Sequence, residues 1–160
     1  ESLRLDGPVK FYQAGLNYDD LDYFFKAEWT RIKSDLITVP NINSRYASVG
    51  YNFYPYSIYA TYASSRADYD APVDEIPIGV APQLDALAFG YRNIFDSLFR
   101  DSLDSVSIGG RWDWKTNIAL KAEITFLDTK DGERGFFNIK DPQAFDGEAV
   151  LYQVALEWVF

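Results

Sequence analysis

The sequence predicts an all-β fold, an antiparallel transmembrane β-barrel, with residues 1–160 forming part of a single barrel domain. Segments of about ten residues alternate between apolar and polar side chains, the period of a strand with one apolar face. The connections between these segments alternate between short and long, as they do in outer-membrane barrels. The chain is 48% hydrophobic and 18% aromatic, which is too rich for a disordered protein.

Composition excludes several classes of function. The formal net charge is -9, and Lys and Arg do not cluster along the sequence, which argues against nucleic-acid binding. Cys and His are absent, so this chain supplies no disulfide, no Cys-ligated metal and no His general base. We therefore expect neither an enzyme nor a cofactor. No run of about 18 apolar residues occurs, so a membrane span would have to be built from strands.

The alternation predicts seven strands. They cover residues 9–18, 23–33, 45–54, 57–65, 102–114, 118–126 and 151–160. The last strand shows the pattern most clearly, because every second residue from Val150 to Phe160 is apolar or aromatic. In a membrane barrel such a face meets lipid and its aromatic residues gather at the two interfaces.

The longest break between strands, residues 66–101, has two parts. Its acidic, Pro-rich first part, up to Pro82, should be irregular. A divalent cation could bind the acidic residues there, although a solvated acidic segment explains them more simply; they are Asp68, Asp70, Asp74 and Glu75. Residues 84–98 carry apolar side chains at spacings of three and four, which predicts one short helix in an external loop. We expect its apolar stripe to lie against the barrel wall or rim.

The polar positions of the strands carry charges of both signs. The segments Lys26-Ala-Glu-Trp-Thr30 and Lys121-Ala-Glu-Ile-Thr125 repeat one pattern, and a water-filled lumen tolerates such pairs. The residues predicted to line the pore are Lys26, Glu28, Arg111, Asp113, Lys121, Glu123 and Glu157. Each could instead be a structural charge that only pairs with a neighbouring strand. The same pattern also fits the solvated face of a soluble sheet.

Seven strands do not close into an antiparallel barrel, because the first and last would pair in parallel, whereas single-chain bacterial barrels have even strand numbers. The sequence therefore predicts that an N-terminal half of the same barrel is missing. If the short turns are periplasmic, the first and last strands both run inward. Arg31 then lies on the lipid-facing side, at the external end of its strand.

The chain resembles the C-terminal half of a Gram-negative outer-membrane porin with about sixteen strands. The similar segments are Phe11-Tyr-Gln-Ala-Gly-Leu-Asn-Tyr18, Tyr23-Phe-Phe-Lys-Ala-Glu-Trp29, Ser107-Ile-Gly-Gly-Arg-Trp-Asp113, Asn117-Ile-Ala-Leu-Lys-Ala-Glu123 and Val154-Ala-Leu-Glu-Trp-Val-Phe160. The resemblance implies passive diffusion of small hydrophilic solutes or ions through a monomer or homotrimer in the outer membrane. It implies that Trp158 and Phe160 belong to a signal read by the barrel-assembly machinery, and that Arg31 contacts lipopolysaccharide in the surrounding lipid.

Two other classes of function stay open at this point. The barrel could be a structural sheath or scaffold around another protein, or an assembly client of a larger complex. It could also be a barrel enzyme whose catalytic His lies outside this chain. The content of the lumen separates the first alternative from a porin, because a pore holds water and side chains whereas a sheath holds polypeptide.

Overall fold

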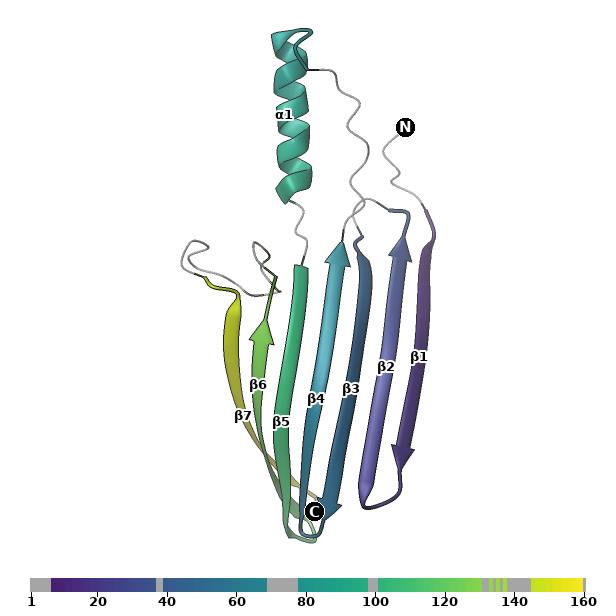
Figure 1. The fold of residues 1–160 in the computed structure, drawn as a ribbon, viewed down its shortest axis with the longest axis vertical. Helices are drawn as coiled ribbons and strands as arrows, with labels where there is room; N and C mark the ends of the chain where they lie inside the picture. Colours follow the sequence, from purple (N-terminus) through teal and green to yellow (C-terminus); the bar gives the residue numbers. More distant parts are fainter. Residues whose placement is uncertain are drawn as a thin grey trace.

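The computed structural model describes residues 7–36, 39–68, 78–97, 101–130, 133, 135, 137 and 145–159. Its strands form one antiparallel sheet in chain order, with a single helix between the fourth and fifth strands (Figure 1). The elements are β1 (Val9–Asp19), β2 (Tyr23–Ser34), β3 (Asn41–Phe53), β4 (Tyr56–Asp68), α1 (Pro82–Ser97), β5 (Asp101–Lys115), β6 (Ile118–Asp128) and β7 (Glu148–Trp158). The prediction of seven antiparallel strands and one short helix is confirmed.

The largest difference from the sequence prediction lies in the β3–β4 hairpin. Residues 41–44 were expected in a loop because Asn and Ser favour turns, but β3 begins at Asn41, which pairs with Asp68 of β4. The Ser44 and Ser65 hydroxyl groups lie 2.8 Å apart across this extension. Local turn propensity is thus overridden by cross-strand pairing.

The short connections between strands all lie at one end of the sheet, and the long connections lie at the other end. Figure 1 shows the three tight turns at its lower end and the long connections with α1 at its upper end. We call these the turn end and the loop end. In the first turn, Asp20 Oδ1 accepts a hydrogen bond of 2.7 Å from the backbone N–H of Tyr23. Asp19 Oδ1 accepts a bond of 3.1 Å from the N–H of Leu21, whose φ is 78°.

The register divides the side chains between two faces. One cross-strand row consists of Lys26, Ser48, Thr61, Ser107 and Thr125. The adjacent row, on the other face, consists of Phe25, Val49, Ala60, Ile108, Ile124 and Tyr152. We call the face of the first row the polar face and that of the second the apolar face. The alternation in the sequence is therefore preserved across all strand pairs.

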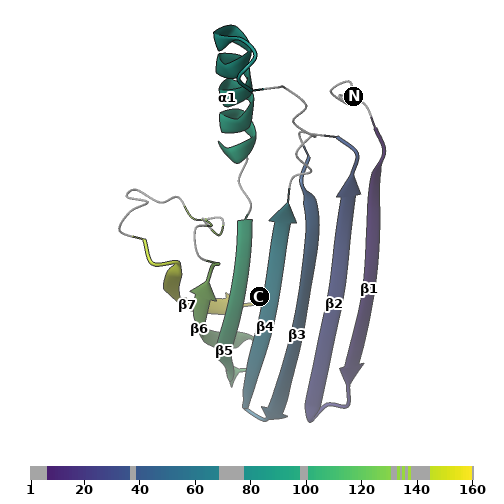
Figure 2. The ribbon, with the colours of Figure 1, turned by 45° about the horizontal axis from the view of Figure 1, so that its top comes forward.

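The sheet is not closed. β1 and β7 are its two edges, and β6 and β7 turn out of the plane of β1 to β4 (Figure 2). Because neighbouring strands are antiparallel throughout, the two edge strands run in the same direction. Any antiparallel closure therefore needs an odd number of additional strands.

The helix α1 stands beyond the loop end of the sheet (Figure 1). It begins at Pro82, a residue suited to the first helical turn, and Asp85 accepts a hydrogen bond of 2.7 Å from the N–H of Gly79. In the described part of the chain, α1 contacts none of the strands. The expectation that its apolar stripe lies on the barrel wall or rim is therefore wrong for these seven strands. Pairing of β4 and β5 continues to Ala67 and Asp101, so the connection leaves the sheet only at its rim.

Hydrophobic burial is almost absent in the part of the chain that the structure describes. Among the described residues the buried hydrophobic side chains are three alanines, Ala67, Ala88 and Ala119. Large side chains in the middle of the apolar face stay exposed, for example Ile108 at 58%. No described helix has the length and apolar character needed to cross a membrane.

Candidate functional site

The polar face is the candidate functional site, because all seven predicted pore-lining residues lie on it. Lys26 and Glu28 come from β2, Arg111 and Asp113 from β5, Lys121 and Glu123 from β6, and Glu157 from β7. The register of the five strand pairs from β2 to β7 places them on the same side of the sheet. That these residues line a pore remains a prediction.

Four of these residues form one ion-paired cluster at the turn end of β5, β6 and β7. Arg111 Nε lies 2.8 Å from Asp113 Oδ1, and Arg111 Nη1 lies 2.6 Å from Glu157 Oε2. The other oxygen of Glu157 pairs with Lys121 Nζ. Ala119, the direct cross-strand neighbour of both Asp113 and Glu157, is 3% exposed. Its small side chain leaves room for the longer ones to meet above it.

Hydroxyl groups occupy the centre of the polar face. Thr61 Oγ1 donates to Ser48 Oγ at 2.8 Å, and the hydroxyls of Ser107 and Thr125 are also 2.8 Å apart. These short side chains pair with one another across neighbouring strands, so hydroxyl groups join β3 to β4 and β5 to β6 there.

Two aromatic side chains lie over glycines of the polar face, a feature that sequence reasoning missed. The Tyr59 ring covers Gly109, where an added Cβ would lie 2.4 Å from the ring, and its hydroxyl donates to Glu123 at 2.8 Å. The Phe24 ring covers Gly50, where an added Cβ would lie 2.1 Å from the ring. The signal in the sequence was a Gly opposite an aromatic residue, which is visible only once the register is known.

Two predicted pore-lining residues outside this cluster, Glu28 and Lys26, interact with uncharged side chains. Glu28 accepts hydrogen bonds from Gln13 Nε2 at 3.0 Å and from the Thr30 hydroxyl at 3.3 Å. Lys26 Nζ lies 5.4 Å from the centre of the Phe24 ring, within the range of a cation–π contact.

The apolar face ends in a belt of aromatic rings at the turn end. Consecutive rings lie 4.7 to 6.1 Å apart between centroids, and the belt crosses β2 to β5. Its members are Tyr23, Tyr51, Phe53, Tyr56, Trp112 and Trp114. Trp158, at the turn end of β7, faces the same side and is 61% exposed. Aromatic girdles of this kind mark the interfaces of transmembrane barrels.

The other residues predicted from the sequence lie away from the polar face or outside the described residues. Arg31 lies on the apolar face near the loop end, directly opposite Tyr12 and Asn43. Phe160 lies outside the described residues, as do Asp70, Asp74 and Glu75. Asp68, the last residue of β4, belongs to no group of three or more potential metal ligands among the described residues.

Comparison with protein families, with curated proteins and with solved structures finds no match for this chain. The resemblance to porins therefore stays a prediction from the sequence pattern.

Proposed function

We propose that this chain is part of a Gram-negative outer-membrane porin, a passive diffusion channel for small hydrophilic solutes or ions. The observation that carries the proposal is the exposure of the apolar face, while the buried hydrophobic side chains of the described chain are alanines. A soluble domain hides its large apolar side chains, and an extended exposed apolar surface marks contact with a partner or a membrane. Lipid would cover this face completely.

The dimensions of the strands support a membrane location. The strands have 11 to 15 residues, and a tilted transmembrane strand needs about 9–11. The aromatic belt at the turn end would then sit at one membrane interface. The polar face would line the lumen.

Additional strands would complete the barrel. The two edge strands run in the same direction, so an odd number of further antiparallel strands would join them and give the even total of bacterial barrels. We propose that an N-terminal half of the same barrel supplies these strands. Recognition of Trp158 and Phe160 by the barrel-assembly machinery, and assembly as a homotrimer, are part of the same proposal.

The charges of the polar face support weak ion selectivity. The seven predicted lining residues comprise three cations and four carboxylates, and four of the seven neutralise one another within one cluster. A pore wall that carries both positive and negative side chains does not create a strong electrostatic potential of one sign along the pore.

Conductance of the complete protein in planar lipid bilayers tests this proposal. We expect open channels with weak selectivity, and the Glu157→Gln variant should shift selectivity toward anions because Arg111 and Lys121 lose their shared carboxylate. The control is Glu148→Gln, which changes a carboxylate on the apolar face and should leave selectivity unchanged. Absence of conductance in correctly inserted protein would rule out a pore.

The sheath alternative rests on a separate observation. Phe11 and Tyr46 lie on the polar face towards the loop end and are 59% and 38% exposed. Exposed aromatic side chains in a lumen would suit a polypeptide as well as a solute. Mass spectrometry of the purified complex separates the two functions, since a sheath retains a stoichiometric protein partner and a pore does not.

A further inference from the structure

The polar face contains a hollow of about 220 Å³ in the half nearer the loop end. Ala63, on β4, is the direct cross-strand neighbour of both Tyr46 and Ser105, and Tyr46 is the direct neighbour of Glu28. Larger side chains therefore stand around a small one, which forms the floor. We call this space the polar hollow, and its polar lining side chains are Glu28, Thr30, Ser44, Tyr46, Ser65 and Ser105.

The polar hollow differs from the centre of the polar face because it leaves hydrogen-bonding groups free. At the centre, the hydroxyl groups pair with one another across the strands. In the hollow, the hydroxyls of Tyr46 and Ser105 have no hydrogen-bond partner among the described residues. Glu28 accepts bonds from Gln13 and Thr30 through Oε1, and within the described chain its Oε2 accepts none. Two hydroxyl donors and one carboxylate oxygen are thus available to a solute.

Apolar surface lies beside these free polar groups. The Tyr46 side chain on β3 is 38% exposed, and Leu103 on β5 borders the hollow on the other side of β4. A Tyr side chain offers a large apolar body together with a polar tip. A pyranose ring has the complementary character, because its C–H faces are apolar and its rim carries hydroxyl groups. The hollow therefore presents both kinds of surface that such a ring needs.

The hydrogen-bonding groups favour a neutral solute over a charged one. An ammonium or guanidinium group carries donors alone, so the Tyr46 and Ser105 hydroxyls would find no acceptor on it. An anion carries acceptors alone and would meet the Glu28 carboxylate. Arg45 also borders the hollow, but the register places its side chain on the apolar face. Alcohol groups both donate and accept, so they suit all three free groups.

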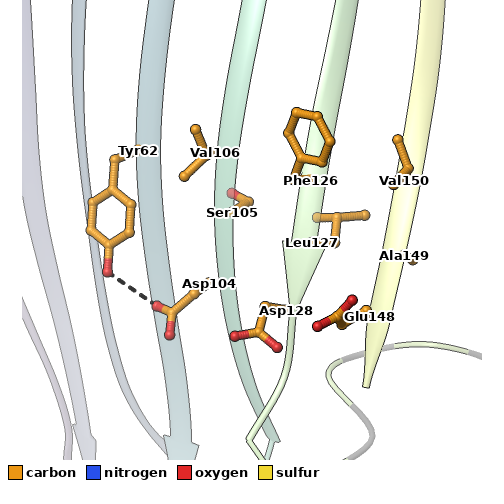
Figure 3. A pocket seen from close by; sticks show the side chains of 10 residues that line it. All are labelled: Tyr62, Asp104, Ser105, Val106, Phe126, Leu127, Asp128, Glu148, Ala149 and Val150. Atoms are coloured by element: carbon orange, nitrogen blue, oxygen red, sulfur yellow. Dashed lines mark hydrogen bonds between the residues drawn. The ribbon is translucent and has the colours of Figure 1, made fainter. Parts of the chain in front are cut away.

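A second hollow provides a comparison on the opposite face. It lies at the loop end of β5, β6 and β7, has a volume of about 370 Å³, and is drawn in Figure 3. The register places Phe126 and Val150 of its lining on the apolar face, together with its three carboxylates, Asp104, Asp128 and Glu148. Under the proposed function this hollow faces lipid, so a solute in the lumen does not reach it.

We propose that the polar hollow is a binding subsite for a neutral, polyhydroxylated solute of about the size of a monosaccharide. This rests on the proposed function, because a solute reaches the hollow only if the polar face lines a lumen. Glu28 accepts hydrogen bonds from the solute, Tyr46 and Ser105 donate to it, and the Tyr46 ring covers one C–H face. Sites for drug-sized ligands measure about 300–1,000 Å³, so the smaller hollow suits a smaller molecule.

The test uses the complete protein in planar lipid bilayers, with glucose as the probe. A bound glucose molecule obstructs part of the lumen, so we expect the ion current to fall with glucose concentration and to reach a plateau. A polyethylene glycol of the same size is the reference, because it excludes ions but lacks the array of hydroxyl groups. Its effect should not saturate. Binding of a neutral solute is not screened by salt, so the half-saturating glucose concentration should be equal at low and high KCl.

Variants of Glu28 and Tyr46 connect this effect to the polar hollow. Tyr46→Phe removes one donor and should raise the half-saturating glucose concentration about five-fold. Glu28→Gln exchanges the carboxylate for a neutral acceptor and should raise it about ten-fold, because hydrogen bonds to charged groups are stronger. Tyr46→Ala also removes the ring and should have a larger effect than Tyr46→Phe. The current of each variant without glucose shows that it has folded and inserted.

Phe11→Ala and Asp128→Asn are the matched controls. The first removes a ring from the polar face outside the hollow, and the second neutralises a carboxylate on the apolar face, so neither should change the half-saturating glucose concentration. Open channels without a saturable response to glucose, or with an unchanged response in Glu28→Gln and Tyr46→Ala, would overturn the subsite and leave the proposed function intact. Absence of channels would contradict the proposed function instead. Saturable block by ethylammonium but not by glucose would reveal a cation site and make the proposal wrong.

Discussion

The two faces of the sheet are built from the same strands but are held by different interactions. On the polar face, side chains are joined by hydrogen bonds and ion pairs, such as those between Tyr59 and Glu123 and between Arg111 and Glu157. The middle of the apolar face has few such bonds, and its turn end is joined by aromatic ring contacts. The difference is what the proposed function requires, in which the polar face meets water and the apolar face meets lipid.

Two neighbouring glycines of β5 show the same difference within one dipeptide. Gly109 is buried under the Tyr59 ring on the polar face, whereas a Cβ added to Gly110 would meet its nearest atom, Ser57 O, at an ordinary 3.5 Å. The polar face is therefore packed by its own side chains at this position. The apolar face leaves space that lipid would fill.

The largest expected effect comes from a charge placed on the apolar face. Ile124 is flanked by Ile108 and Tyr152 in a row of apolar residues. If this row lies near the membrane midplane, Ile124→Arg should destabilise the folded protein by about 2–4 kcal/mol. The free energy of unfolding in lipid vesicles, measured by denaturant titration, checks this expectation.

Gln153→Arg is the matched control for this substitution. Gln153 is exposed in the adjacent row on the polar face, directly opposite Glu123. A new cation there would face a carboxylate and water, so little change in stability is expected. Equal costs for the two arginines would contradict the assignment of lipid to one face and water to the other. Leu156→Arg should behave as Ile124→Arg does, because it lies on the apolar face.

A smaller effect is expected from the glycine pair. Gly109→Ala forces the Tyr59 ring away from the wall, because the new Cβ would lie 2.4 Å from it. Overpacking of this kind costs about 1–3 kcal/mol. Gly110→Ala should be nearly neutral by comparison. The same denaturant titration measures both variants, and a destabilised Gly110→Ala with an unaffected Gly109→Ala would show that the tightly packed face has been misidentified.

The strands and their faces could be predicted from the sequence because alternation is a local property. Residues 23–33 reveal their apolar and polar sides without knowledge of any partner strand. Features that need the register could not be predicted in this way. Tyr59 and Gly109, or Glu28 and Tyr46, come together only after neighbouring strands are aligned. The expected contact between α1 and the sheet was wrong for a related reason. An apolar stripe predicts that one side of a helix is covered, but it does not identify the surface that covers it.

The smallest expected effect concerns a turn that belongs to neither face. The backbone N–H of Tyr23 and the hydroxyl of Tyr18 donate hydrogen bonds to the Asp20 carboxylate, at 2.7 and 3.0 Å, and hold its pKa below the ordinary value of 3.8. Because the folded pKa is lowered, the ionised carboxylate stabilises the turn above pH 3.8, and this stabilisation is lost as the pH falls through the lowered pKa. Asn at this position keeps one acceptor oxygen but does not titrate.

The difference in stability between the original protein and Asp20→Asn should therefore shrink as the pH is lowered from 7 to below 3. The turn is fully exposed to solvent, so the effect is screened and should be smaller than either change on the faces. Denaturation midpoints of both proteins across this range give the measurement, and other carboxyl groups cancel because they titrate in both. A difference that stays constant with pH would mean that Asp20 holds the turn through its shape alone and that its charge contributes nothing.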